Sequence, residues 1–304
     1  MRNLVRLPRA LFGTVLLFAA TATLAEEKVF DRSFTVPPGG LLTVNADGAR
    51  ISVSGRDSSR VVVHMVAKAS QKELDELKLS ASQVEGGVTV EMLRPERRGW
   101  FNWGSWNMDA SIEVTLPRSY RVEAKTSGGD VLLEGVAGPS RVRTSGGGIV
   151  ARNMKGDLDG QTSGGGLRLE SIDGSIQART SGGSIHGATI RGDINAHTSG
   201  GDVRLLAIDG KIQASTSGGG VQCELVGANR GISASTSGGD IRLTMPKGIT
   251  GTLNAESSGG TIRTDFPVTA THWAEHHLNG SINGGGEAIY LHTSGGGITL
   301  SAAN

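Results

Sequence analysis

Apolar and polar residues alternate along most of the chain, and from residue 126 onward the alternation repeats with a nearly fixed period. The stretch 175–180, SIQART, places an apolar side chain at every second position, which is the period of a β-strand and not of a helix. The phrase Thr-Ser-Gly-Gly marks each repeat. It begins at Thr126, Thr144, Thr162, Thr180, Thr198, Thr216 and Thr236, recurs as Ser257-Ser258-Gly259-Gly260, and returns at Thr293. Five spacings are 18 residues, the next two are 20 and 21, and the last is 36, or two units.

Three columns of apolar residues recur in the unit, counted from its threonine. The sixth position holds Val131, Ile149, Leu167, Ile185, Val203, Val221, Ile241, Ile262 and Ile298. The eleventh holds Val136, Met154, Ile172, Ile190, Ile208 and Val226, and the fifteenth holds Leu158, Ile176, Ile194, Ile212 and, after the two-residue shift, Ile232. Glycines at the third, fourth and thirteenth positions indicate corners. Each unit therefore predicts two strands and two corners, which become stable by stacking about 4.8 Å apart.

The predicted fold is all-β: a single-stranded β-solenoid of about 18-residue coils with a degenerate N-terminal β capping region. A three-sided left-handed helix of hexapeptides also suits 18 residues, but the corner glycines fall unevenly and no six-residue aliphatic period occurs. The pattern favours a flattened coil of either hand. The 47 glycines do not indicate collagen, because glycine does not recur at every third position.

The chain divides into three predicted regions. Residues 1–25 have the pattern of a secretory signal, with arginines, an apolar run from Ala10 to Ala22 and a small-residue cleavage site, expected after Ala25 with Ala22 as the alternative. Residues 26–120 keep the strand pattern without the repeat phrase and predict an irregular cap, with brief helical character from Gln71 to Leu79. Residues 121–304 form the repeat region, with an insertion at 265–281. We therefore expect an exported protein, periplasmic or at the cell surface, that is not integral to the membrane.

Charge and cysteine usage exclude several functions. The formal net charge of +1 argues against a dedicated nucleic-acid binder. The one cysteine, Cys223, occupies a column otherwise filled by leucines and is predicted to be a buried apolar residue. No intramolecular disulfide is possible with a single thiol, and no cofactor is implied.

Two groups of residues are candidates for ligand binding. Three of the four tryptophans lie in one loop, where Trp100, Phe101, Trp103 and Trp106 could stack on sugar rings, enter a membrane interface, anchor a partner protein or cap the core. Outward-facing arginines recur at the seventh position, as Arg168, Arg204, Arg242 and Arg263, and a second group ends the unit, as Arg143, Arg179 and His197. Such rows could bind an acidic polysaccharide or simply keep the sheet soluble.

Metal and catalytic motifs are weak. The sequence His272-Trp273-Ala274-Glu275-His276 matches a zinc-peptidase pattern, but that pattern requires a long helix, so an adventitious site at His272 and His276 is the most it predicts. Aspartates after the double glycine do not recur in successive coils and therefore do not form a calcium ladder. No catalytic residue is predicted.

The Thr-Ser-Gly-Gly phrases, the later Ile282-Asn283-Gly284-Gly285-Gly286 and the secretory start together resemble the bacterial putative-adhesin family, a domain of unknown function expected to form a β-solenoid. The resemblance covers roughly Phe34 to Leu300. It implies a non-enzymatic envelope protein that presents a rigid β surface to a glycan or protein partner. The alternatives are a polysaccharide-cleaving β-helix enzyme, for which the short glycine corners leave little material to form a cleft, and a self-assembling fibre that associates through its solenoid ends.

Overall fold

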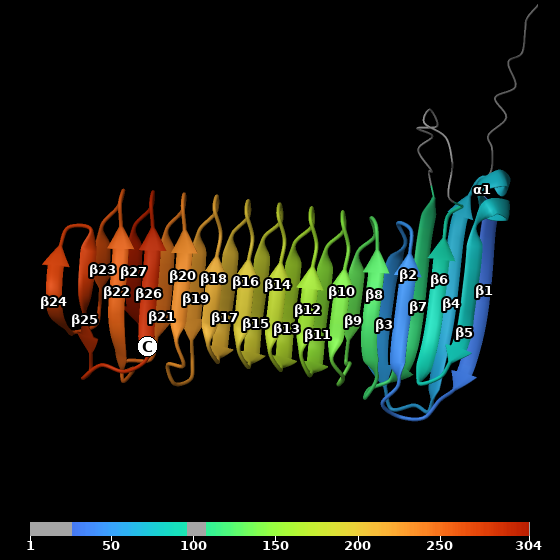
Figure 1. Ribbon diagram of the computed structural model, residues 1–304, viewed down its shortest axis with the longest axis horizontal. Helices are drawn as coiled ribbons and strands as arrows, with labels where there is room; N and C mark the ends of the chain where they lie inside the picture. The colour runs from blue at the N-terminus through green and yellow to red at the C-terminus, as the bar shows by residue number, and fades with distance from the viewer. Residues whose placement is uncertain (1–25, 96–107, 304) are drawn as a thin grey trace, which may run out of the picture.

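The computed structural model describes residues 26–95 and 108–303. In this part of the chain, strands form two long sheets that face each other across a single continuous apolar core (Figure 1). We name them sheet A, with 13 strands, and sheet B, with 14. The predicted all-β solenoid is confirmed, and its coil is flattened into two layers.

Each repeat contributes one strand to each sheet, in parallel register with the repeats before and after it (Figure 1). The repeat strands of sheet A are β9 (Val131–Glu134), β11 (Ile149–Lys155), β13 (Leu167–Asp173), β15 (Ile185–Arg191), β17 (Val203–Asp209), β19 (Val221–Leu225) and β21 (Ile241–Met245). Those of sheet B are β8 (Arg121–Thr126), β10 (Ser140–Arg143), β12 (Leu158–Gln161), β14 (Ile176–Arg179), β16 (Ile194–His197), β18 (Ile212–Ser215) and β20 (Ile232–Thr236). Like residues therefore lie side by side along the stack.

The threonine of the repeat phrase joins each coil to the one before it. The Thr180 hydroxyl donates a hydrogen bond of 2.7 Å to the carbonyl oxygen of Gly165, and Thr198 does the same to Gly183. The Thr180 oxygen also accepts from the amide of Gly183 within its own corner. These threonines are buried, so the hydroxyl satisfies backbone groups that water does not reach. The repeat phrase is thus a structural device at one corner of the coil.

The predicted apolar columns are buried, with two departures. Val226 is 51% exposed, and Leu225 is buried in its place, paired with Ile208. The reason is a register shift between β17 and β19: two residues separate Leu205 from Ile208, with Ala207 at a positive φ, but only one separates Cys223 from Leu225, so the inward residue falls one position earlier. Ile262 is only half-buried because it lies in the last strand of sheet A.

Cys223 lies between Leu205 and Leu243 on neighbouring strands and is 1% exposed. Burial raises the pKa of its thiol from 9.0 to about 12, because the thiolate would be desolvated. We therefore expect the folded protein to resist thiol-alkylating reagents at pH 8 and to react fully in urea. A native protein that is alkylated at the rate of a free thiol would contradict this burial.

The N-terminal region closes one end of both sheets. It adds β1 (Glu26–Thr35), β3 (Arg50–Arg56), β4 (Arg60–Ala69) and β7 (Asp109–Pro117) to sheet A, and β2 (Leu41–Ala46), β5 (Lys78–Val84) and β6 (Gly87–Leu93) to sheet B. The coil β2–β3 stacks on the coil β8–β9, and β6 and β7 pair in parallel with β2 and β3 on the other side. Antiparallel strands complete both sheets: β4 and then β1 follow β7 in sheet A, and β5 follows β6 in sheet B.

A short helix, α1 (Gln71–Glu76), lies at this end beside β1 and β4 (Figure 1). A capping box of Ser70 and Glu73 begins it, and Leu74 and Leu77 are buried in the core. The Lys28 ammonium of β1 donates to the carbonyl oxygens of both leucines, at 2.7 and 3.0 Å. The helix is shorter than the range expected from sequence, and it anchors the cap to β1.

At the other end the spatial order of the coils departs from their order in the sequence. The strands are β22 (Gly251–Ser257), β23 (Ile262–Thr264), β24 (Val268–Ala274), β25 (His277–Ile282), β26 (Ala288–Thr293) and β27 (Ile298–Ala302). The final coil, β26–β27, lies between β20–β21 and β22–β23 and not at the end of the stack. The end of sheet B is instead an antiparallel hairpin, β24–β25 (Figure 1).

Candidate binding surface

The aromatic group predicted from sequence, Trp100, Phe101, Trp103 and Trp106, lies outside the described residues. It stays a prediction.

The four predicted arginines of the seventh column form one straight row on the outer face of sheet A. Strand register places Arg168, Arg204, Arg242 and Arg263 on every second strand, with His186, Gln222 and Thr299 between them. Arg168 pairs with Glu170 at 3.3 Å, and Arg242 with Asp240 at 2.7 Å. Half of the row's positive charge is therefore balanced locally.

The histidine motif does not form a helix. His272 lies in β24 and His276 in the turn before β25, so the two side chains are not one helical turn apart. The His276 ring nitrogen Nδ1 hydrogen-bonds the carbonyl oxygen of Gly260 at 3.0 Å. Across residues 26–95 and 108–303, no group of three or more histidine, cysteine, aspartate or glutamate side chains has a metal-binding arrangement.

The aspartates that follow the double glycine hold adjacent corners together. The carboxylate of Asp130 accepts a hydrogen bond of 2.7 Å from the amide of Gly148 in the next coil, and Asp202 accepts one of 2.8 Å from Gly220. At the opposite corner, Asp157 accepts from the amide of Ser175. Turn geometry accounts for these carboxylates, as the sequence pattern indicated.

A shallow groove of about 410 Å³ follows the repeat corners on the outer side of sheet B. We call it the basic groove. Its basic side chains are Lys125, Arg143, Arg179 and His197, which occupy equivalent positions on β8, β10, β14 and β16, with Gln161 of β12 between the two arginines. The exposed serines of the repeat phrase also line it, namely Ser145, Ser163, Ser181 and Ser199. No aspartate or glutamate lines the basic groove.

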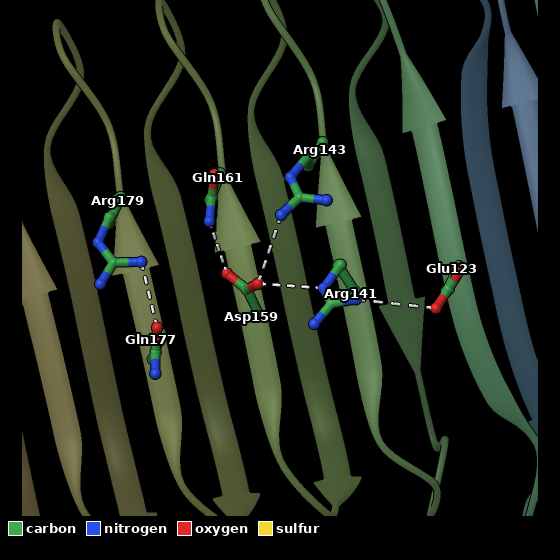
Figure 2. A network of polar contacts seen from close by, with 7 residues as sticks. All are labelled: Glu123, Arg141, Arg143, Asp159, Gln161, Gln177 and Arg179. Carbon is green, nitrogen blue, oxygen red and sulfur yellow. Dashed lines mark hydrogen bonds and ion pairs between the residues drawn. The ribbon is translucent and has the colours of Figure 1, made fainter.

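The polar network beside the basic groove fixes two of its side chains (Figure 2). Asp159 pairs with Arg141 at 3.2 Å and with Arg143 at 3.7 Å, and accepts a hydrogen bond from Gln161 at 2.9 Å. Arg179 instead donates to the neutral amide oxygen of Gln177 at 3.1 Å. Among the described residues, no carboxylate forms an ion pair with Lys125 or Arg179. The positive charge of the groove is therefore only partly balanced.

A second hollow lies at the N-terminal ends of the same sheet B strands, and it is a poorer site for an anion. It has a volume of about 390 Å³ and contains Arg121 and Arg141 but also Glu123, Asp157 and Asp159. Three carboxylates against two guanidinium groups would repel an anionic ligand. The sheet A hollow beside Arg168 and Arg204 likewise contains Glu170. Among these three hollows, the basic groove is the one without a carboxylate in its lining, so it is the most favourable for an anionic ligand.

Sequence reasoning identified three of the basic side chains in the groove, Arg143, Arg179 and His197, as the group that ends the unit. It missed Lys125, which precedes the first repeat phrase and so lay outside the aligned units. It also could not show that the groove lacks carboxylates, because the positions of the nearby acidic residues relative to the arginines depend on strand register. The structure supplies that register.

Coils of two strands, stacked in parallel about a flattened core, define the class of this protein as a two-sheet β-solenoid. The chain belongs to the Toastrack DUF4097 family, whose model matches residues 41–301. This match agrees with the resemblance drawn from the repeat phrases, to a family of unknown function. A search of curated proteins found none that matches the chain.

Several solved structures are similar to this chain over most of its length. A putative adhesin from Parabacteroides merdae shares 10% identity, covers 90% of this chain and 96% of its own, and has a TM-score of 0.37. A putative cell adhesion protein from Clostridium sporogenes shares 13% identity over 91% and 100%, with a TM-score of 0.25. A putative lipid binding protein from Parabacteroides distasonis shares 12% over 91% and 97%, with a TM-score of 0.28. Similarities this low assign no activity or ligand to the chain.

In the described part of the chain, no helix has the length and apolar character needed to cross a membrane.

Proposed function

We propose that this chain is a non-enzymatic, exported interaction module that binds an extended anionic polymer, such as an acidic envelope polysaccharide, along the basic groove. The observation that carries the proposal is a row of basic side chains, held in strand register, with no carboxylate lining the groove between them. Adjacent strands lie about 4.8 Å apart, so Arg143 and Arg179, two strands apart, are held about 10 Å from each other. Fixed spacing reduces the ordering cost of binding a repeating ligand.

The chemistry of the groove favours binding over cleavage. Glycoside cleavage ordinarily requires two carboxyl groups on either side of the bond to be broken, and the basic groove has none. Arginines and serine hydroxyls are suited instead to recognising carboxylate, sulfate or phosphate groups and neighbouring hydroxyls. Export and an envelope location rest on the signal-like residues 1–25 and belong to the same proposal.

Replacing Arg143 and Arg179 together by glutamine is expected to weaken binding to a polyuronate by about twofold to thirtyfold. Each exposed ion pair contributes about 0.2–1 kcal/mol, and the variant loses two such pairs with the polymer. Binding would be measured by isothermal titration at low and high salt, since screening should weaken it further. A neutral glucan of equal length should bind neither protein.

The matched control is the double variant Arg168→Gln and Arg204→Gln on sheet A, which removes the same charge from the opposite face. It should bind as the unmodified chain does. Loss of binding in this control alone would place the site on the sheet A row. If the unmodified chain does not bind the polyuronate at low salt, the proposed function is wrong.

A further inference from the structure

Strand β24 is the edge strand of sheet B at the C-terminal end of the stack. It pairs only with β25, on one side, with a register shift between Ala270 and His272 that leaves Thr271 without a partner residue in β25, and six of its seven residues are exposed. At the same end, sheet A stops at β23, a strand of three residues. The hairpin β24–β25 therefore continues sheet B beyond the last strand of sheet A, at the end of the stack opposite α1 (Figure 1). Its unpaired backbone groups are positioned to accept another strand.

One face of this edge strand is apolar, and no strand of sheet A covers it. Trp273 lies opposite Leu278, which is 1% exposed and itself lies opposite the buried Ala255. Residues directly opposite each other in antiparallel strands share a face, so Trp273 lies on the core side of sheet B. Yet its side chain is 66% exposed, because no strand of sheet A faces it. Val268, opposite the buried Ile282, is on the same side.

The charges at the two ends of the stack differ, and the difference indicates what covers β24. The edge strand of sheet A at the N-terminal end, β1, carries Glu26, Glu27, Lys28, Asp31 and Arg32. Charged side chains on an edge strand oppose its pairing with another edge strand. The sequence of β24, VTATHWA, contains no lysine, arginine, aspartate or glutamate. When a strand pairs antiparallel with its own copy, a charge close to the twofold axis lies beside its own like, so a strand without charged side chains is compatible with such pairing.

We infer that β24 pairs antiparallel with β24 of a second copy about a twofold axis, giving a tail-to-tail dimer in which sheet B runs continuously through both molecules. This arrangement hydrogen-bonds both edge strands and places the two apolar sides next to each other on the same face of the joined sheet. It closes the assembly at two copies, because a twofold interface uses the same surface on both partners. The fibre expected from free solenoid ends does not form by this contact. The inference does not rest on the basic groove.

The test uses Thr271, the central residue of β24, which pairing about the middle of the strand would place nearest the twofold axis. Its hydroxyl donates to the carbonyl oxygen of Asn279 at 3.2 Å, so both charged variants lose this bond equally. The unmodified chain should have the mass of a dimer by light scattering at micromolar concentration and dissociate on dilution. Thr271→Lys places two like charges together at the axis, so it should raise the dissociation constant at least about tenfold. Ser82→Lys adds the same charge to β5, the edge strand of sheet B at the N-terminal end of the stack, and should leave the dimer intact. Circular dichroism would confirm that both variants fold.

Charge reversal separates a direct contact from an indirect loss of structure. Thr271→Glu alone should also be monomeric, whereas an equimolar mixture of Thr271→Glu and Thr271→Lys should form a one-to-one dimer. A monomeric unmodified chain would overturn the inference. So would assemblies larger than two copies, a dimer lost through Ser82→Lys, or a mixture of the two Thr271 variants that fails to associate.

Discussion

Replacing Gly183 by alanine is expected to destabilise the protein by about 3 kcal/mol, although the change adds a single methyl group. A Cβ atom at this position would overlap the carbonyl oxygen of Gly165 in the coil below. That oxygen already accepts the hydroxyl proton of Thr180, so it cannot move without breaking the contact between coils. Overpacking against a backbone that cannot relax costs about 1–3 kcal/mol, and the upper end applies here.

Equilibrium unfolding in urea measures the effect, with two other glycines as controls. A Cβ at Gly248 would meet nothing within 4 Å, so alanine there should change the free energy of unfolding by no more than about 0.5 kcal/mol. At Gly182 the Cβ would lie 3.3 Å from the carbonyl oxygen of Gly164, so an intermediate loss is expected. Equal effects at Gly183 and Gly248 would show that the stacked corners tolerate a side chain.

The repeat could be predicted from sequence because stacking makes equivalent positions share one environment. Thr180 and Thr198 make the same bond to the coil below, and Ile176 and Ile194 lie side by side in one buried column. Equal environments favour equal residues, so the period remains visible in the chain. The flattened cross-section of the coil was predicted from the uneven spacing of the corner glycines.

One repeated backbone feature left no sequence pattern. The tenth position of four successive units has a positive φ, of 53°, 55°, 57° and 54° in Asn153, Ser171, Thr189 and Ala207. These residues share no chemistry, and positive φ costs a residue with a Cβ about 1–2 kcal/mol. The surrounding strand imposes the bend, since the residues on either side are fixed by parallel pairing. Tertiary context, and not local preference, sets this conformation.

The candidate site was predictable only in part, for a similar reason. Arg143 and Arg179 could be recognised as outward residues from period alone. Whether they face a carboxylate depends on register, which places Asp159 beside Arg143 and leaves Arg179 against Gln177. The order of the last coils is equally hidden in the sequence, because a coil has the same apolar columns wherever it enters the stack.

Removing the last coil by ending the chain after Gly286 is expected to unfold the C-terminal part while leaving the earlier coils folded. The missing segment contains Ile289, Leu291, Ile298 and Leu300, all fully buried. Burial of each stabilises the fold by about 1.5–3 kcal/mol, so the total loss, about 6–12 kcal/mol, rivals the stability of a whole domain. The coils up to Met245 keep their own neighbours, and stability in stacked repeats is mainly a nearest-neighbour property.

The bonds at the repeat corners show why β22–β23 should not simply move into the vacated place. Thr293 donates to the carbonyl oxygen of Gly239, and Ser257 donates to that of Gly296, so the final coil lies between the two corners. Asn229 also bonds the carbonyl oxygens of Thr250 and Glu287, which fixes the start of β22 relative to the start of β26. Hydrogen exchange should show that the amides of β22 lose protection in the shortened chain while those of β16 keep it. Protection of β22 equal to that in the full chain would mean that β22–β23 pair directly with β20–β21, and that the final coil is not needed to hold them.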